Sequence, residues 1–210
     1  MIFKNRIEAG NLLAVKLEPY KSNNTIIMAI PRGGVPIGFE VAEKLHLPLE
    51  VVLSKKIGHP LHKEYAIGAV TLKNKVLSEA AKGISSSYIE EETKRIRALL
   101  TKRFKEYYGK KEPLDLKDKV LIIVDDGIAT GNTILSTIEM LHNENPKKII
   151  VAVPVAPLSA VQKLQNSDYI DEVICLSVPT NFRAVGQFYQ YFDQVDDLEV
   201  KALLNKSTVS

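Results

Sequence analysis

The segment 120–133, Val-Leu-Ile-Ile-Val-Asp-Asp-Gly-Ile-Ala-Thr-Gly-Asn-Thr, constrains the fold of this chain more than any other stretch. Its five leading apolar residues have the length and β-branched content of a strand that is buried on both faces. The residues that follow show the apolar stripe of a helix, at Ile134, Ile138 and Leu141. The segment therefore predicts a strand, the acidic pair Asp125 and Asp126, a tight loop and a helix.

The loop inside this segment has the features of a phosphate site. A loop that leads into a helix gathers unpaired backbone N–H groups at the positive end of the helix dipole. Gly127 and Gly131 allow the backbone to curl around an anion, and Thr130 and Thr133 add hydroxyl donors. The two acids repel a phosphate, so they suit hydroxyl groups or a metal ion on the same ligand. The pattern indicates a phosphorylated sugar.

Solidly apolar strands alternate with helices along the chain. This order predicts an α/β fold with a doubly wound, mainly parallel sheet and helices on both faces. Ligands of such sheets bind at the carboxyl ends of the strands, where the loops 31–34, 125–133 and 154–157 are expected. A long helix is expected over residues 87–108, with one buried stripe at Ile89, Thr93, Ile96, Leu100, Phe104 and Tyr107.

The composition is that of an ordinary soluble protein, with 45% apolar and 25% charged residues. Its 210 residues favour a single domain over 1–210. The net charge of +3 is too balanced to argue for a nucleic-acid or membrane partner, although it leaves room for a local basic patch. No apolar run approaches the roughly 20 residues of a membrane span, and the N-terminus lacks the apolar centre of a signal peptide. With Cys175 as its single cysteine, the chain is expected to be cytoplasmic.

Two further loops carry groups that suit anions. Arg32, Gly33 and Gly34 combine a planar cation with a backbone that can approach a ligand closely, although an ordinary glycine-rich turn has the same residues. The polar segment 54–67 shows little periodicity and is interpreted as a mobile loop. Its basic groups are Lys55 and Lys56, with His59, His62 and Lys63 behind them. A solvated loop without ligand contacts is the alternative, and the two histidines lack the partners of a metal site.

The known phosphate motifs with a P-loop lysine or with the G-x-G-x-x-G pattern do not match residues 120–133. The segment instead resembles the phosphoribosyl-pyrophosphate (PRPP) motif of the type I phosphoribosyltransferases, which has an apolar run, two acids and Thr-Gly-x-Thr. The resemblance implies that Asp125 and Asp126 hold the ribose 2′ and 3′ hydroxyls. It also implies that one continuous loop cradles the 5′-phosphate, namely Gly127, Ile128, Ala129, Thr130, Gly131, Asn132 and Thr133.

The same resemblance assigns further roles. Arg32, Gly33 and Gly34 become the pyrophosphate loop, in which the family often has a cis peptide. The loop 54–67 would close over the reaction centre and bring Lys55 and Lys56 to the leaving pyrophosphate as catalytic groups beside the acids. Mg²⁺ would bridge the pyrophosphate and the ribose, with Asp125 and Asp126 contacting it directly or through water.

A small hood is implied from residues 1–20 and the aromatic segment 179–193, with Phe182 and Arg183 as acceptor contacts. Plain packing of these aromatic side chains is the alternative. The expected activity is transfer of the 5-phosphoribosyl group from PRPP to a nitrogenous acceptor. The alternatives are a regulator that binds PRPP or a nucleotide without catalysis, and a metal-dependent enzyme acting on other phosphate esters. Many proteins of this fold are dimers, and the oligomeric state and the acceptor are left open.

Overall fold

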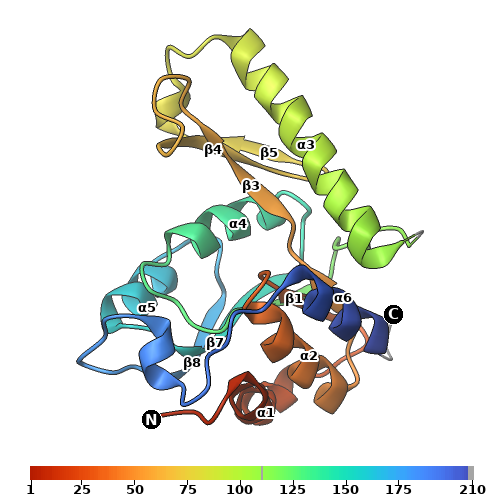
Figure 1. Cartoon of the computed structure of the whole chain (residues 1–210), viewed down its shortest axis with the longest axis vertical. Coiled ribbons are helices and arrows are strands. Elements are labelled where there is room, and N and C mark those ends of the chain that lie inside the picture. The colour runs from red at the N-terminus through yellow and green to blue at the C-terminus, as the bar shows by residue number, and fades with distance from the viewer. Residues whose placement is uncertain (110, 208–210) are drawn as a thin grey trace.

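A computed structural model describes residues 1–109 and 111–207 (Figure 1). None of the helices in this described part is both long and apolar enough to cross a membrane. The elements in chain order are α1 (Arg6–Leu17), η1 (Glu18–Tyr20), β1 (Thr25–Ala29), α2 (Gly34–Leu45), β2 (Leu49–Val51), β3 (Ser54–Gly58), β4 (Ala66–Thr71), β5 (Lys75–Leu77), η2 (Glu79–Ala81), α3 (Ser86–Tyr108), β6 (Val120–Val124), α4 (Asn132–His142), β7 (Lys148–Val155), α5 (Leu158–Gln165), β8 (Glu172–Ser177), η3 (Val185–Phe188) and α6 (Asp197–Lys206).

Two sheets organise the molecule. Among the described residues, five parallel strands form one sheet in the order β2-β1-β6-β7-β8, and three antiparallel strands form a second in the order β3-β4-β5. The predicted α/β fold with a mainly parallel sheet is confirmed. Ala29 lies opposite Val124, and Val124 lies opposite Ala152, so β1, β6 and β7 are in register near their carboxyl ends. The loops that leave β1 and β6 therefore emerge side by side.

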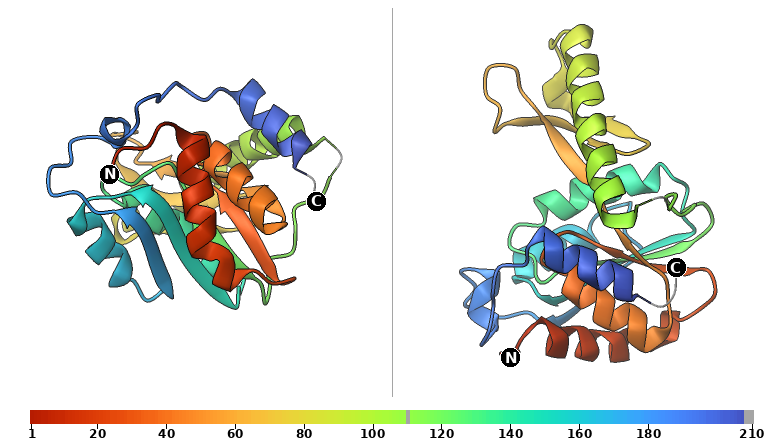
Figure 2. Two further views of the ribbon diagram at one scale, coloured as in Figure 1. Left: turned by 90° about the horizontal axis from the view of Figure 1, so that it is seen from below. Right: turned by 45° about the vertical axis from the view of Figure 1, so that its right-hand side comes forward.

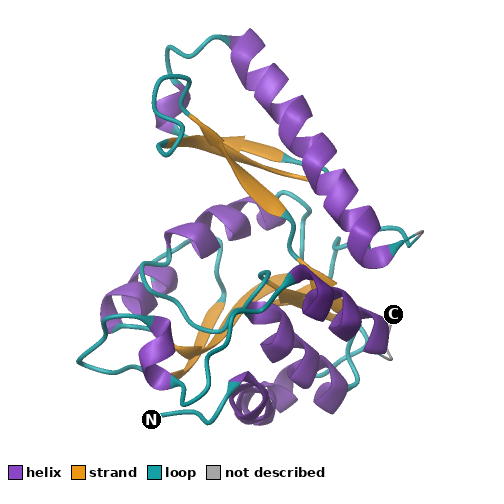
Figure 3. Cartoon of the chain, viewed as in Figure 1, coloured by secondary structure: helices purple, strands orange, loops and turns teal. Residues whose placement is uncertain are grey.

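Helices cover both faces of the parallel sheet (Figures 2 and 3). The side chains of β6 alternate between the two layers, because successive residues of a strand point to opposite faces. Leu121 and Ile123 pack with residues of α4 and α5, whereas Ile122 and Val124 pack with residues of α1 and α2. All four side chains are fully buried, which explains the continuous apolar run in the sequence.

The antiparallel sheet and α3 project from one side of the parallel sheet, at the top of Figure 1. The buried residues of α3 are those predicted from the sequence: Ile89, Thr93, Ile96, Leu100, Phe104 and Tyr107. The apolar members of this stripe belong to the same cluster as Ile57, Ile67 and Val70 of β3 and β4. The subdomain therefore shares one continuous core with the layer that holds α1 and α2.

The predicted loop over residues 54–67 is wrong at both ends, and its last two residues, Ala66 and Ile67, begin β4. Ser54–Gly58 forms β3, in which Lys55 lies opposite Val70 and Lys56 opposite Ala69 of β4. The segment has few apolar residues, and its partner strand lies further along the chain, so the local sequence gives no strand signal. The mobility expected for the rest of this segment stays a prediction.

The N-terminal segment and the aromatic segment 179–193 lie next to each other. Phe3 donates its N–H to the carbonyl oxygen of Phe188 at 2.8 Å, and its own carbonyl accepts from the N–H of Gln190 at 2.8 Å. Helix α1, which is also expected to belong to the hood, packs against α2. A Cβ atom at Gly10 would lie 2.7 Å from Cβ of Glu40, which requires glycine at this crossing. The hood over residues 1–20 and 179–193 stays a prediction.

Candidate functional site

The acidic pair lies at the carboxyl end of β6. Asp125 and Asp126 follow Val124 directly, and Oδ1 of Asp125 accepts the N–H of Asp126 at 2.8 Å. Burial raises the pKa of the Asp125 carboxyl well above its ordinary value, and the neighbouring charge of Asp126 raises it further. Burial also raises the pKa of Asp126, although the Arg6 guanidinium opposes this change. Buried carboxyls with shifted pKa values at the edge of a sheet mark a candidate functional site.

The glycine loop 31–34 is packed against these acids. A Cβ atom at Gly33 would overlap the Asp126 carboxylate. A Cβ atom at Gly34 would lie 2.7 Å from the carbonyl oxygen of Val124 and 2.9 Å from Cα of Asp125. The peptide between Pro31 and Arg32 is cis. Two loops that are separated by about ninety residues in the sequence are thus in direct contact.

Arg32 itself is exposed. Its Nη1 lies 4.0 Å from Oδ2 of Asp197, at the first residue of α6. The hydroxyl of Tyr107 donates to the other oxygen of Asp197 at 2.5 Å. Arg32 therefore lies near the junction of α2, α3 and α6, and its predicted contact with pyrophosphate stays a prediction.

The predicted phosphate loop exposes its polar groups at the start of α4. Gly131 has φ 75°, a left-handed conformation that favours glycine, and no side chain in the described residues caps the first turn. Ile128 anchors the loop, because its side chain is buried and its N–H donates to the carbonyl oxygen of Val155 at 2.9 Å. The exposed residues of the loop are Ala129, Thr130, Asn132 and Thr133, and the side chain of Asn132 accepts a hydrogen bond from Lys163.

The two lysines predicted to act together line the same cavity but start from opposite faces of one strand. Lys55 and Lys56 are neighbours in β3, so their side chains leave opposite faces of the strand. Nζ of Lys56 donates to Oε2 and to the carbonyl oxygen of Glu64, each at 2.8 Å. A cavity of about 390 Å³ between the antiparallel sheet and α4 is lined by both lysines and by Asn132 and Thr133. The lysine strand thus adjoins the phosphate loop, and a catalytic role for either lysine stays a prediction.

The other basic residues of this segment lie at the tip between β3 and β4. The rings of His59 and His62 stack with centroids 5.9 Å apart. Nζ of Lys63 donates to the hydroxyl of Tyr88 at 2.8 Å. Within the described residues, no group of three or more His, Cys, Asp or Glu side chains is close enough to hold a metal ion.

The aromatic segment provides packing as well as exposed surface. Phe182 is partly buried and stacks on Phe188 at a centroid distance of 5.4 Å. Arg183 is exposed, and its N–H donates to Oε1 of Gln187 at 3.1 Å. Phe188 and Tyr189 are buried, as the packing interpretation expects. The proposed acceptor contacts of Phe182 and Arg183 stay a prediction.

Two residues at the site were assigned no role from the sequence. Arg6 donates from Nε at 3.0 Å and from Nη2 at 2.8 Å to Oδ2 of Asp126. The hydroxyl of Tyr189 donates to the carbonyl oxygen of Asp126 at 2.6 Å. Both contacts join distant parts of the chain, and neither residue stands in a local pattern that would indicate them.

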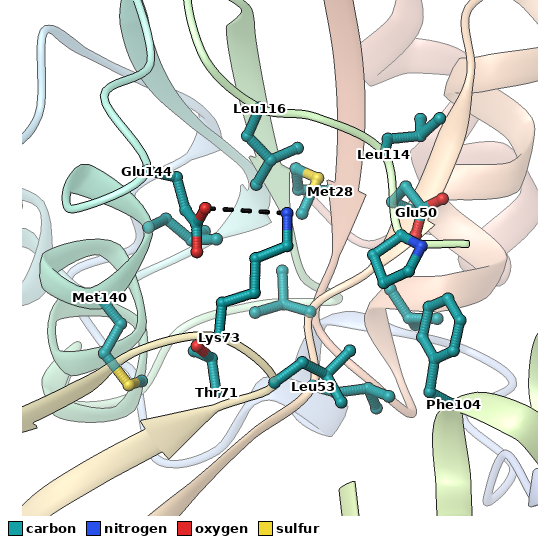
Figure 4. Close-up of a pocket in the computed structure, with 15 residues that line it drawn as sticks. Met28, Glu50, Leu53, Thr71, Lys73, Phe104, Leu114, Leu116, Met140 and Glu144 are labelled. Atoms are coloured by element: carbon teal, nitrogen blue, oxygen red, sulfur yellow. Dashed lines mark ion pairs between the residues drawn. The ribbon is translucent and has the colours of Figure 1, made fainter. Parts of the chain in front are cut away.

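A second cavity, of about 70 Å³, lies at the far end of α4 (Figure 4). Its lining is mostly apolar, and Lys73 and Glu144 form an ion pair of 3.9 Å across it. Glu144 lies beyond the last residue of α4, whereas the predicted phosphate loop ends in the first turn of this helix, so the cavity is separate from the acidic pair. Glu50 also lines it, and burial raises the pKa of Glu50 to about 7.

Replacing Glu50 by Gln is expected to stabilise the protein above pH 7. The folded chain keeps the Glu50 proton up to a pKa of about 7, whereas the ordinary value is 4.5, so the unfolded state binds fewer protons between these values. Wild-type stability therefore falls as pH rises through this window. A shift of one pKa unit corresponds to about 1.4 kcal/mol, so the gain at pH 8 reaches about 3 kcal/mol. Urea unfolding at pH 4 and pH 8 checks this, and an equal effect at both pH values would contradict it.

The fold and the site together define a class of α/β protein. The parallel sheet carries the acidic pair and the glycine loop in contact at one edge, so this is an α/β protein with its candidate site at the carboxyl ends of the strands. Residues 2–193 match the family model of the phosphoribosyl transferase domain. The chain belongs to the phosphoribosyl transferase family.

Individual proteins and a solved structure are similar to the chain over different lengths. A protein of Mycobacterium tuberculosis, provisionally named a phosphoribosyl transferase, is 33% identical over 210 residues, which cover 98% of this chain and 47% of that protein. The chain thus spans about half the length of the curated relatives it matches. A ribose-phosphate pyrophosphokinase of Prochlorococcus marinus is 33% identical over 98 residues, which cover 44% of this chain and 28% of that protein. The solved structure of TT1426 from Thermus thermophilus is 38% identical, covers 99% of each chain and has a TM-score of 0.86.

Proposed function

We propose that the chain transfers the 5-phosphoribosyl group of PRPP to a nitrogenous, base-like acceptor and releases pyrophosphate. The observation that carries this proposal is the contact between two loops at one edge of the sheet, where a Cβ atom at Gly34 would lie 2.9 Å from Cα of Asp125. Groups suited to ribose hydroxyls and groups suited to pyrophosphate are then within reach of one small ligand. Membership of the phosphoribosyl transferase family supports the same reaction.

The chain would act by positioning and by electrostatics. Asp125 and Asp126 accept hydrogen bonds from the ribose hydroxyls, and the unpaired amides at the start of α4 bind the 5′-phosphate. The loop of Arg32, Gly33 and Gly34 binds the leaving pyrophosphate. With the ribose held at both ends, the acceptor nitrogen forms its bond to C1 while the bond from C1 to the pyrophosphate oxygen breaks. Fixed dipoles and charges around C1 stabilise the cation-like transition state.

Mg²⁺ fits the donor set of this site. The cation prefers oxygen ligands and is commonly held by one or two carboxylates together with substrate phosphates and water. Asp125 and Asp126 are the residues that would hold it, directly or through water. Burial raises the pKa of both carboxyls, so their negative charge is incompletely compensated by the surrounding protein. When bound, Mg²⁺ would neutralise charge on the leaving pyrophosphate.

Pyrophosphate release tests the proposal. The chain is incubated with PRPP and Mg²⁺ and with purine, pyrimidine and amide acceptors in turn. We expect release that depends on the acceptor and on Mg²⁺. Absence of PRPP binding would overturn the proposal. Tight PRPP binding without release for any acceptor would instead favour a regulator that senses PRPP, and hydrolysis of simple phosphate esters without PRPP would favour a metal-dependent phosphate-ester enzyme.

A further inference from the structure

Arg6 is held at three points beside the acidic pair. Both Nε and Nη2 donate to Oδ2 of Asp126, at 3.0 and 2.8 Å, while Nη1 donates to the carbonyl oxygen of Asp193 at 2.8 Å. The guanidinium carbon lies 4.0 Å from the centroid of the Phe192 ring. The Arg6 side chain is only 12% exposed. A long cationic side chain that is fixed in this way has lost most of its rotamer freedom before any ligand binds.

The backbone under Arg6 is fixed as well. Arg6 is the first residue of α1, and the helix is capped by Asn5, whose side chain accepts the N–H of Glu8 at 3.0 Å. Phe3 is fully buried and pairs with Tyr189. A cation in the first turn of a helix is disfavoured by the helix dipole, by about 0.3–1 kcal/mol. The pairing of Arg6 with Asp126 offsets this cost. An arginine is therefore placed here for its contact with the acidic pair and not for the stability of α1.

We propose that Arg6 is the positioning residue for Asp126, holding Oδ2 through a forked contact so that Oδ1 is presented to a ribose hydroxyl. In residues 1–109 and 111–207, no side chain donates a hydrogen bond to Oδ1. The groups around Asp126 are Arg6 from α1, Asp125 from its own loop, the Tyr189 hydroxyl on its carbonyl oxygen, and the backbone of Gly33. A lysine has no planar fork and cannot fix the carboxylate in the same way.

This inference rests on the proposed ribose site and links it to both ends of the chain. Arg6 comes from the N-terminal helix, and its other partners, Phe192 and Asp193, come from the C-terminal aromatic segment. The contacts of Arg6 are with Asp126, Asp193 and Phe192, and none of these residues belongs to the phosphate loop. Within the acidic pair, the hydrogen bonds from Arg6 therefore act on the carboxylate of Asp126 alone. Removing the fork should therefore weaken recognition of one ribose hydroxyl and leave the binding of phosphate groups intact.

The test compares ligands that differ by one hydroxyl. Calorimetry measures binding of ribose 5-phosphate, 2-deoxyribose 5-phosphate and 3-deoxyribose 5-phosphate to the wild-type chain and to the Arg6→Gln and Arg6→Lys variants. Loss of a partner that orients a ligating side chain commonly costs about tenfold or more, so we expect Arg6→Gln to bind ribose 5-phosphate about tenfold more weakly. The deoxy analogue that lacks the hydroxyl held by Asp126 should lose less than about twofold, and Arg6→Lys should recover affinity only in part.

Controls separate this role from a structural one. Lys16→Gln removes an exposed charge from the last turn of the same helix and should leave all three affinities unchanged. Thermal unfolding of each ligand-free variant checks the fold.

Equal losses of affinity for all three ligands, or no loss for any of them, would overturn the proposal, and so would a wild-type chain that does not bind ribose 5-phosphate. Because these measurements need no turnover, a chain that binds ribose 5-phosphate but never releases pyrophosphate would refute the proposed reaction while still testing Arg6. If turnover is found, Arg6→Gln should raise KM for PRPP more than it lowers kcat.

Discussion

A chain with both Asp125→Asn and Asp126→Asn is expected to bind Mg·PRPP at least about a hundredfold more weakly than the wild type. Each carboxylate would lose a charge-assisted hydrogen bond to the ribose, and such bonds contribute about 1.5–3 kcal/mol apiece. The lower bound for two bonds, about 3 kcal/mol, corresponds to about a hundredfold in affinity. Calorimetry with purified PRPP and Mg²⁺ measures this directly and does not depend on knowledge of the acceptor.

The single variants guard against a trivial loss through unfolding. Burial raises the pKa of Asp125 far above its ordinary value, so Asp125→Asn removes a costly buried charge and should keep or raise the unfolding temperature. Asp126→Asn instead leaves the Arg6 guanidinium without its carboxylate and should be the less stable of the two. Asp168→Asn, at an exposed residue between α5 and β8, is the matched control and should change neither property. Unchanged PRPP binding in the double variant would contradict the assignment of the ribose site.

Features that depend on local sequence were predictable. The spacing of apolar residues predicts both the strand β6 and the stripe of α3, and the structure buries these residues. The neighbourhood of the loops 31–34 and 125–133 was also predictable, because both follow strands of one parallel sheet and must emerge at the same edge. The sequence thus indicates the acidic pair and the glycine loop, and the order of the strands accounts for their contact.

Features that depend on distant pairing were not predictable in this way. The strand β3 exists because it pairs with β4, and only that pairing shows that Lys55 and Lys56 leave opposite faces. Arg6 contacts a carboxylate 120 positions away, and Tyr189 contacts the same residue across 63 positions. No spacing rule connects such residues. The acidic pair can therefore be recognised from a local motif, whereas the side chains that surround it can be identified only from the tertiary structure.

The glycines of the loop 31–34 give the second large effect, and the two positions should behave differently. Gly33 has φ −60°, so its backbone accepts alanine and only the new Cβ atom causes a conflict. At Gly33 that atom would meet Oδ2 of Asp126, the oxygen that Arg6 holds, so the carboxylate must shift and its pairing with Arg6 is disturbed. Gly33→Ala should therefore lose no more stability than Asp126→Asn, which also disturbs the pair with Arg6. It should bind PRPP at least about tenfold more weakly, since a displaced carboxylate cannot make its charge-assisted hydrogen bond of about 1.5–3 kcal/mol.

At Gly34 the new Cβ atom meets backbone. It would lie 2.7 Å from the carbonyl oxygen of Val124 and 2.9 Å from Cα of Asp125, so the end of β6 must move. Overpacking of this kind costs about 1–3 kcal/mol, and Gly34→Ala should lose both unfolding free energy and PRPP affinity.

Gly83→Ala is the control for a new Cβ atom outside the site. Alanine at φ 82° bears backbone strain of about 1–2 kcal/mol, but in the described residues its Cβ atom would meet nothing within 4 Å. Urea unfolding measures the stability of the three glycine variants, and calorimetry measures their affinity for PRPP. If Gly33→Ala kept full PRPP affinity, the contact between the glycine loop and the acidic pair would have no part in binding.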